Sequence, residues 1–129
     1  MVAHIVHKDS DGHLAVVAVL LKDGAENRFL KSFWDQLPQS AGPEQAFANI
    51  KVNIADLLPD AKGYYTFMGS LTTPPCTEQV RWFVLKSPVE LSEAQIAAFT
   101  KLYPNNARPT QPTNGRKIEE GPAGATSGR

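Results

Sequence analysis

The sequence predicts a mainly β protein of the α+β class, with short helices beside one sheet. Segments rich in branched and aromatic residues, which are typical of strands, occur at residues 2–6, 14–21, 64–68 and 80–85. Helical periodicity or a helix cap is confined to shorter stretches between these segments. The chain has 129 residues, a usual length for one domain.

The first two strands are predicted to form a hairpin. Residues 2–6 read as a strand that begins almost at the first residue, and the cluster Asp9-Ser10-Asp11-Gly12 is typical of a turn. The run Leu14–Leu21 is apolar throughout and ends at Lys22. Its length and its valines favour a strand buried on both faces over a helix.

Two helices are predicted. Apolar side chains recur every three or four residues along Glu26–Leu37, and Pro38 is expected to end that helix. The sequence Ser92-Glu93-Ala94-Gln95 is a capping-box pattern that opens a second helix containing Ile96 and Phe99. The stretch Ala46–Ile54 is ambiguous.

The remaining segments are a stiff loop and an irregular C-terminal region. Two prolines in Thr72-Thr73-Pro74-Pro75 remove backbone donors and disfavour helix, so this segment is extended or turning. From Pro104 the chain lacks periodicity, and no large apolar residue follows Ile118. We therefore assign residues 1–118 to the domain and expect 119–129 to be a disordered tail.

Composition excludes several classes of protein. Thirteen Lys and Arg balance thirteen Asp and Glu, which argues against nucleic-acid or membrane-surface binding through bulk charge. The longest apolar run falls far short of the roughly 18–20 residues of a membrane span, and the N-terminus shows no secretory signal pattern. Cys76 is the one cysteine, so it is a free thiol or its partner lies outside this chain.

Two features carry possible chemistry. Val2, His4 and Val6 share one face of the first strand, whereas Ile5 and His7 share the other, so His4 and His7 are not expected to bind one metal ion together. A lone strand histidine is more often structural than a ligand. The loop Gly69–Glu78 can hold a hydroxyl in a fixed orientation, or it is simply a rigid connection between two strands.

The segment Tyr64–Glu78 with Val80-Arg81-Trp82 resembles the signature of the α-carbonic anhydrases, in the form found in bacterial and secreted members. Ala3–His7, Leu14–Val17 and Asn106–Pro112 resemble further blocks of that family in the same order. The resemblance implies that this chain is the C-terminal half of the family domain. The expected fold is the C-terminal part of a large, twisted, mainly antiparallel sheet with short peripheral helices.

The activity implied by the resemblance is the zinc-dependent, reversible hydration of CO2 to bicarbonate, a lyase reaction. Family members bind Zn2+ through three histidines, and His4 matches the third of these. The His-x-His pair and the proton-shuttle histidine have no counterpart among residues 1–129, and Val2 stands where a glutamate normally orients the third ligand. We expect the zinc site to be incomplete in this chain, and the chain alone to be inactive, poorly soluble or associated with the missing N-terminal half.

The resemblance also assigns substrate positions. Thr72 matches the catalytic threonine that orients zinc-bound hydroxide, and Thr73 matches a neighbouring hydroxyl at the bicarbonate and sulfonamide site. The apolar wall where CO2 rests is matched by Val6, Val16, Leu71, Val80 and Trp82. The expected partners are CO2, bicarbonate and sulfonamide or anion inhibitors, with no nucleic acid and no membrane, and the full-length protein is expected to be periplasmic or secreted. The alternative is a non-catalytic carbonic-anhydrase-like binding or interaction protein.

Overall fold

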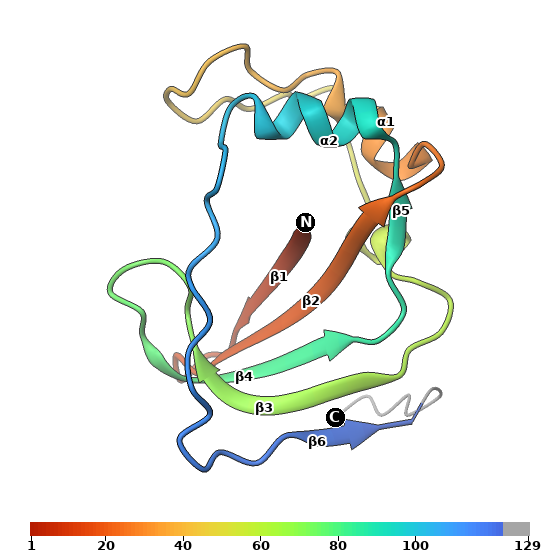
Figure 1. Ribbon diagram of the computed structural model, residues 1–129. Coiled ribbons are helices and arrows are strands. Elements are labelled where there is room, and N and C mark those ends of the chain that lie inside the picture. The colour runs from red at the N-terminus through yellow and green to blue at the C-terminus, as the bar shows by residue number, and fades with distance from the viewer. Residues whose placement is uncertain (123–129) are drawn as a thin grey trace.

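A twisted sheet of six strands organises the molecule in the computed structural model, which describes residues 1–122 (Figure 1). The strand order is β1-β2-β4-β3-β6, and β5 pairs with the end of β2. The bounds are β1 Val2–Lys8, β2 Leu14–Asp23, β3 Tyr64–Ser70, β4 Glu78–Leu85, β5 Val89–Leu91 and β6 Glu119–Gly121. The β2–β4 and β2–β5 ladders are parallel, and the β1–β2, β3–β4 and β3–β6 ladders are antiparallel. The mainly β prediction is confirmed.

The predicted hairpin between β1 and β2 is present. Gly12 donates its backbone N–H to the Asp9 carbonyl at 3.1 Å, and its φ of 88° lies in the left-handed region that glycine tolerates best. Beyond this turn β1 and β2 pair in register, with His4 opposite Ala18 and Val6 opposite Val16. β1 is the outermost strand of the sheet on this side.

Alternation along the strands separates two apolar clusters, one on each face of the sheet. The helix-covered face holds Val19, Leu21 and Leu85 with Leu30, Leu57 and Leu91. The opposite face holds Val16, Ala18, Val80 and Trp82. β2 contributes to both clusters, as predicted for a strand buried on both sides, although Leu20 near its end is 41% exposed.

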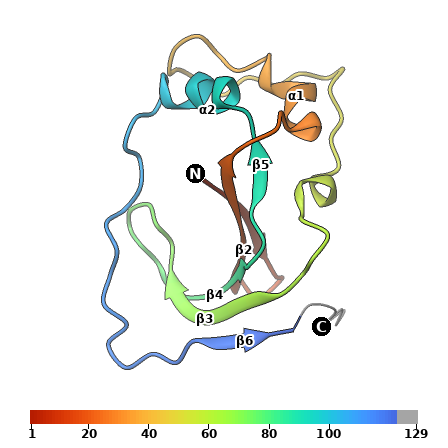
Figure 2. The same cartoon turned by 45° about the vertical axis from the view of Figure 1, so that its right-hand side comes forward.

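Helices α1 (Arg28–Trp34) and α2 (Glu93–Thr100) lie together on one side of the sheet, and a short 3-10 helix, η1, spans Ile54–Leu57 (Figure 2). α1 is shorter than the predicted Glu26–Leu37. Its start is set by Asn27, whose side chain accepts the Leu30 N–H at 2.9 Å. Its last turn tightens to three-residue hydrogen bonds at Gln36 and Leu37, so the helix ends before Pro38.

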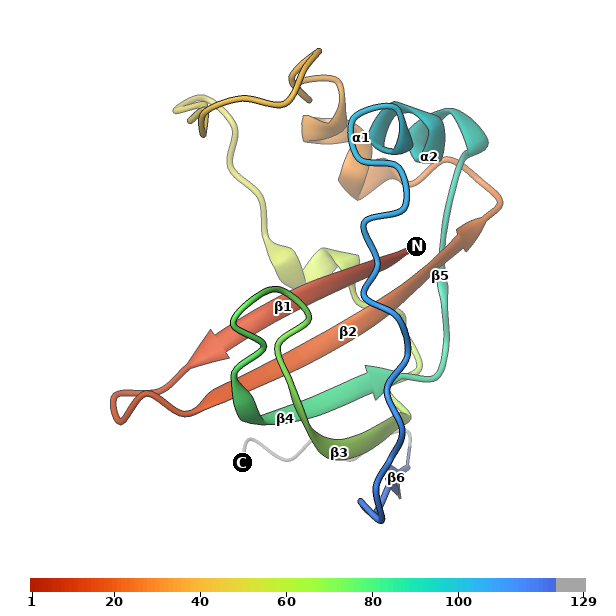
Figure 3. The same ribbon diagram turned by 60° about the vertical axis from the view of Figure 1, so that its left-hand side comes forward.

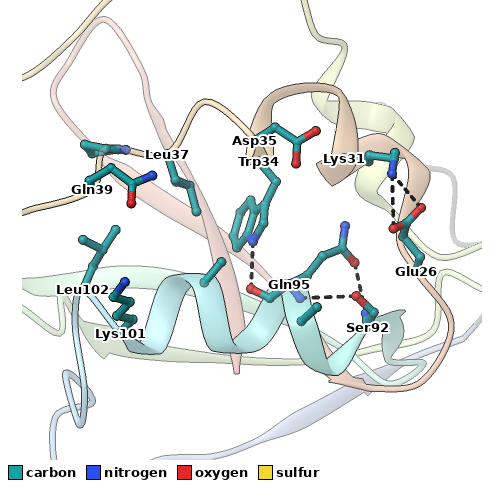
Figure 4. Close-up of a pocket in the computed structure, with 13 residues that line it drawn as sticks. Glu26, Lys31, Trp34, Asp35, Leu37, Gln39, Ser92, Gln95, Lys101 and Leu102 are labelled. Atoms are coloured by element: carbon teal, nitrogen blue, oxygen red, sulfur yellow. Dashed lines mark hydrogen bonds and ion pairs between the residues drawn. The ribbon is translucent and has the colours of Figure 1, made fainter.

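The predicted capping box of α2 also joins the two helices (Figure 4). The buried Gln95 side chain accepts from the backbone N–H groups of Ser92 and Asn27 at 3.0 and 2.9 Å, and its amide donates to the Asn27 carbonyl. The Trp34 indole N–H donates to the Gln95 carbonyl at 2.8 Å. The Gln95 side chain therefore forms hydrogen bonds with backbone groups at the N-terminal ends of both helices. Its own polar atoms are thereby paired although the residue is buried.

The C-terminal segment returns across the sheet before it pairs with it. After α2 the chain crosses in front of β2, β4 and β3 and then forms β6 (Figure 3). The assignment of residues 119–121 to a disordered tail is therefore wrong: Thr66 pairs with Glu119 and Tyr64 with Gly121. Composition indicated no strand there because pairing with β3, rather than side-chain burial, orders this segment. The remainder of the expected tail, residues 123–129, lies outside the described residues.

Among the described residues, no helix has the length and apolar character needed to cross a membrane.

Candidate functional site

The candidate site lies on the sheet face opposite the helices, where His4 meets Trp82. The His4 imidazole lies edge-on to the Trp82 indole, with ring centroids 4.9 Å apart and planes at 80°. Phe67 of β3 stacks on the same indole, with ring centroids 6.4 Å apart and planes at 7°. Strand alternation places all three rings on one face, because Trp82 lies opposite both Val16 and Phe67 in the ladders.

An open groove of about 440 Å³ lies on this face. His4 and Thr72 both line it, together with the apolar side chains of Val2, Ala18, Leu20, Phe67, Trp82, Val84 and Ile118. Such a surface, mostly apolar with a few polar groups, is suited to a small uncharged ligand.

The apolar positions assigned from the resemblance fall on this face. Val16, Val80 and Trp82 are buried in one cluster, at 1%, 0% and 6% exposure, and Leu71 packs against them. Val6 shares the face through its pairing with Val16 but is 57% exposed, because β1 is the edge of the sheet. Three of these side chains therefore pack in one buried cluster with Leu71, and of the five positions only Trp82 is among the residues that line the groove.

Thr72 and Thr73 project from the loop between β3 and β4, and both are exposed. The loop is closed by hydrogen bonds from the Leu71 N–H to the Thr77 carbonyl at 2.9 Å and from the Cys76 N–H to the Thr73 carbonyl at 2.8 Å. Thr72 lines the groove with His4, whereas Thr73 is not among the groove residues. The loop therefore brings Thr72, but not Thr73, to the groove.

The opposite wall of the groove comes from residues 108–118, a segment in which the sequence pattern predicts no site role. Arg108 donates to the Ser70 hydroxyl at 2.9 Å, and Arg116 donates to the Met68 carbonyl at 2.8 Å. Arg116 also donates to the carbonyls of Thr113 and Pro112. Two arginines within a proline-rich segment of no periodicity were the available signal, because such side chains can anchor irregular backbone through hydrogen bonds.

The electrostatics of the groove favour an uncharged His4. Partial burial of the ring lowers the pKa of His4 below its ordinary value. Arg108 and Arg116, the charged residues among those that line the groove, are both cationic. A neutral imidazole is the form that binds a metal ion.

Within residues 1–122, the side chains at the groove do not complete a zinc site. A catalytic zinc site uses three protein ligands, and His4 is the only imidazole, thiol or carboxylate among the residues that line the groove. Elsewhere in the described chain one group of three suitable side chains occurs, Asp9, Asp11 and His13. That group lies exposed at the tip of the β1–β2 hairpin and does not include His4. His4 and His7 are not brought together in any such group.

The fold and the groove define an α+β protein with a mixed sheet, which carries a histidine and a threonine at one open and largely apolar groove. Residues 3–121 match the family described as eukaryotic-type carbonic anhydrase. This match spans most of the chain, which therefore belongs to the α-carbonic anhydrase family.

Individual relatives agree with this family and with the fold. The chain is 43% identical over 120 residues to a carbonic anhydrase of Nostoc, covering 93% of this chain and 46% of that protein. It superposes on the α-carbonic anhydrase of Thermovibrio ammonificans, solved with the inhibitor sulfanilamide, with a TM-score of 0.84 and 43% identity over 91% of this chain and 52% of that one. It also superposes on dioscorin, solved in complex with ascorbate, with a TM-score of 0.79 and 32% identity, covering 95% and 53% of the two chains.

The chain spans about half the length of the curated relatives it matches. The complete fold of those relatives therefore contains structure that residues 1–129 do not supply.

Proposed function

We propose that this chain supplies the C-terminal half of a carbonic anhydrase active site and acts in the hydration of CO2 once a complementary half is present. The observation that carries the proposal is the groove in which His4, Thr72 and the buried apolar cluster meet. His4 is the proposed metal ligand, and Thr72 is the proposed catalytic residue. When bound, zinc supplies a Lewis acid that makes water nucleophilic near neutral pH, a general property of carbonic anhydrases rather than a result of this structure.

The chain's own residues have defined tasks in this proposal. The proposed apolar wall for CO2, which has no net charge to attract, presents Trp82 to the groove, and the buried Val16 and Val80 and the side chain of Leu71 pack in the same cluster. Val6 is proposed to extend that wall at the strand edge. Thr72 Oγ accepts a hydrogen bond from the attacking oxygen and fixes its direction. Thr73 is proposed to contact bicarbonate or a sulfonamide beside it.

The missing half is the proposed partner. β1 is an edge strand, and residues 2–7 carry no proline and no carboxylate, lysine or arginine that would discourage pairing. Val2 and Val6 are 42% and 57% exposed along it. A strand that paired there would cover these side chains and bring its own groups beside His4.

CO2 hydration measured by stopped flow tests the proposal. The 129-residue chain with added zinc is expected to show no rate above buffer and to retain less than one zinc after dialysis. Mixing with the N-terminal half of a bacterial relative is expected to give activity that acetazolamide removes, and His4→Ala should abolish that activity while His7→Ala leaves it unchanged. Inhibitor-sensitive activity of the chain alone would overturn the view that its site is incomplete. A well-folded mixture without activity would overturn the assignment of the groove.

A second function, binding without catalysis, is favoured by one observation. Val2 lines the groove two residues before His4, at the position where the family resemblance places a glutamate. The dioscorin structure, of similar fold, holds ascorbate, so a small polar organic molecule is a reasonable candidate ligand. Isothermal titration of the chain with ascorbate in the presence of EDTA distinguishes this function, because binding without metal supports it and the absence of heat excludes this ligand.

A further inference from the structure

The buried indole of Trp82 contacts two separate parts of the groove. Its ring meets the His4 imidazole edge-on at 4.9 Å, and its Nε1–H donates to the Ser70 carbonyl at 3.0 Å. Phe67 stacks against the indole from β3, and the side chain is only 6% exposed. The indole is therefore held in one place by its neighbours.

The hydrogen bond from Trp82 reaches the point where the sheet gives way to the Thr72 loop. The β3–β4 ladder shifts register between Gly69 and Ser70, and on β4 Gln79 has a positive φ of 61°. A bulge of this kind interrupts the regular ladder hydrogen bonds. The indole N–H therefore satisfies a carbonyl at the irregular end of β3.

Gly69 allows the indole to approach this closely. A Cβ built on Gly69 would lie 3.0 Å from Trp82 Cδ1 and 3.2 Å from Nε1. A larger residue at this position would require the Trp82 or Phe67 ring to shift by a few tenths of an ångström. The absence of a side chain at position 69 therefore helps to keep the Trp82 indole within hydrogen-bond distance of the Ser70 carbonyl.

We propose that Trp82 is a positioning residue that couples the His4 imidazole to the Thr72 loop, the ring orienting one and the N–H anchoring the other. Its significance for catalysis rests on the proposed function, in which His4 and Thr72 act together. Only Leu71 separates Thr72 from Ser70, and the Leu71 N–H itself closes the loop on Thr77. Movement of the Ser70 carbonyl therefore displaces the loop at its base.

The two contacts can be separated by substitution in the 129-residue chain without metal. Trp82→Phe keeps an aromatic ring beside His4 but removes the N–H, whereas Trp82→Leu removes both. The matched control is Trp34→Phe, because Trp34 also donates its indole N–H to a backbone carbonyl, that of Gln95 at 2.8 Å, on the other face of the sheet. The readouts are hydrogen exchange of the Leu71 amide and the NMR shifts of the His4 ring protons.

Trp82→Phe is expected to speed Leu71 exchange about tenfold, as for the loss of one buried hydrogen bond, with His4 ring shifts close to those of the wild type. Trp82→Leu is expected to alter both readouts. Trp34→Phe should alter neither, and the exchange of Val19 in the helix-side core should stay unchanged in Trp82→Phe. Equal acceleration at Leu71 and Val19 would show a purely structural role and overturn the proposal, as would an unchanged Leu71.

If Trp82→Phe does not fold, measurements on the wild-type chain test the proposal instead. Proton contacts between the His4 and Trp82 rings, together with slow exchange of the Trp82 indole N–H, support the coupling, and absence of either contradicts it. These measurements involve no turnover. A failure of the CO2 hydration experiment therefore leaves the positioning role standing, and a failure here leaves the proposed function standing.

Discussion

The His4 and Trp82 rings meet across β2, the strand that lies between β1 and β4. Ala18 pairs with His4 on β1, while its neighbour Val16 pairs with Trp82 on β4. Ala18 is 3% exposed, and its single methyl group leaves space for two rings whose centroids are 4.9 Å apart. We therefore expect the small size of the Ala18 side chain to permit the ring contact.

Ala18→Val is expected to separate these rings. Two additional methyl groups in a packed position cost about 1–3 kcal/mol, and the rings must tilt apart to accept them. Circular dichroism melts should show lower stability, and the near-ultraviolet signal of Trp82 should change. Ala15→Val, on the opposite face of β2, is the control. A variant of normal stability with an unchanged Trp82 signal would contradict this role of Ala18.

Val2→Glu is expected to strengthen metal binding at His4. Position 2 shares a strand face with His4, and a carboxylate that accepts a ring N–H orients the imidazole and raises its basicity. Such a partner typically changes metal affinity by about 10–100-fold. Competition with a chromogenic chelator should show a lower Kd for Zn2+ by about tenfold.

Lys8→Glu is the matched control for Val2→Glu. It adds more negative charge to the same strand face, but four residues from His4, or about 13 Å along a strand. Equal tightening by the two variants would indicate general charge attraction rather than orientation of His4.

Strong local patterns allowed much of the fold to be predicted. The Ser92 capping box and the Asp9–Gly12 turn depend on neighbouring residues, and both were confirmed. The apolar run of Leu14–Leu21 correctly indicated a strand that contributes to both faces. In contrast, local patterns did not predict the early end of α1, where the last turn tightens, or the strand β6, which forms by pairing with β3.

The positions of the candidate residues were predictable where strand alternation applied, and not where distant segments meet. The alternation of β1 separated His4 from His7, whereas the roles that the family resemblance gives to Thr72 and the apolar wall stay predictions. Neither could reveal that residues 108–118 cross the groove, since that depends on arginine hydrogen bonds to Ser70 and Met68, about forty residues or more away in sequence. The contact between His4 and Trp82 likewise follows from strand order, which periodicity does not determine.

Asp9→Asn is expected to flatten the acid dependence of stability. The Asp9 carboxylate accepts hydrogen bonds from the His13 side chain and from the N–H groups of His13 and Asp11, each at 2.9 Å, and the His13 side-chain bond contributes most to lowering the pKa of Asp9. A lowered folded-state pKa means that this stabilisation is complete above the unfolded value of about 3.9. It is lost as the pH falls through the folded-state pKa.

Melting temperatures measured between pH 6 and pH 2.5 check this prediction. The wild type should lose more stability than Asp9→Asn below about pH 4, because the asparagine has no proton to gain. Asp60→Asn, an exposed aspartate before β3, is the control and should follow the wild type. Parallel curves for the wild type and Asp9→Asn would show that the hairpin carboxylate does not contribute.

Thr66→Val is expected to stabilise the chain. Thr66 Oγ1 is buried and has no hydrogen-bond partner among the described residues. Replacing this hydroxyl with a methyl group removes a desolvation cost of about 1–3 kcal/mol and keeps the branched shape that suits a strand. Urea unfolding should show a higher midpoint. Thr100→Val removes a hydroxyl that does donate, to Ala97 at 3.3 Å, and should not stabilise. A lower midpoint for Thr66→Val would indicate that the hydroxyl has a partner in solution.

Gly121→Ala is expected to detach β6 from the sheet. A Cβ at position 121 would overlap the Tyr64 ring, which lies directly across the β3–β6 ladder. Because Tyr64 also packs against the helix-side core, the ring cannot move away freely, and β6 must shift instead. Overpacking of this kind costs about 1–3 kcal/mol. We expect this cost to exceed the stabilisation that a three-residue strand and the Lys86–Glu120 ion pair provide.

Hydrogen exchange should therefore become fast at residues 119–121 while the Val19 amide stays protected. Gly42→Ala, where a Cβ meets nothing within 4 Å, is the control. Protection of residues 119–121 that survives Gly121→Ala would mean that Tyr64 does not hold β6 in the register described.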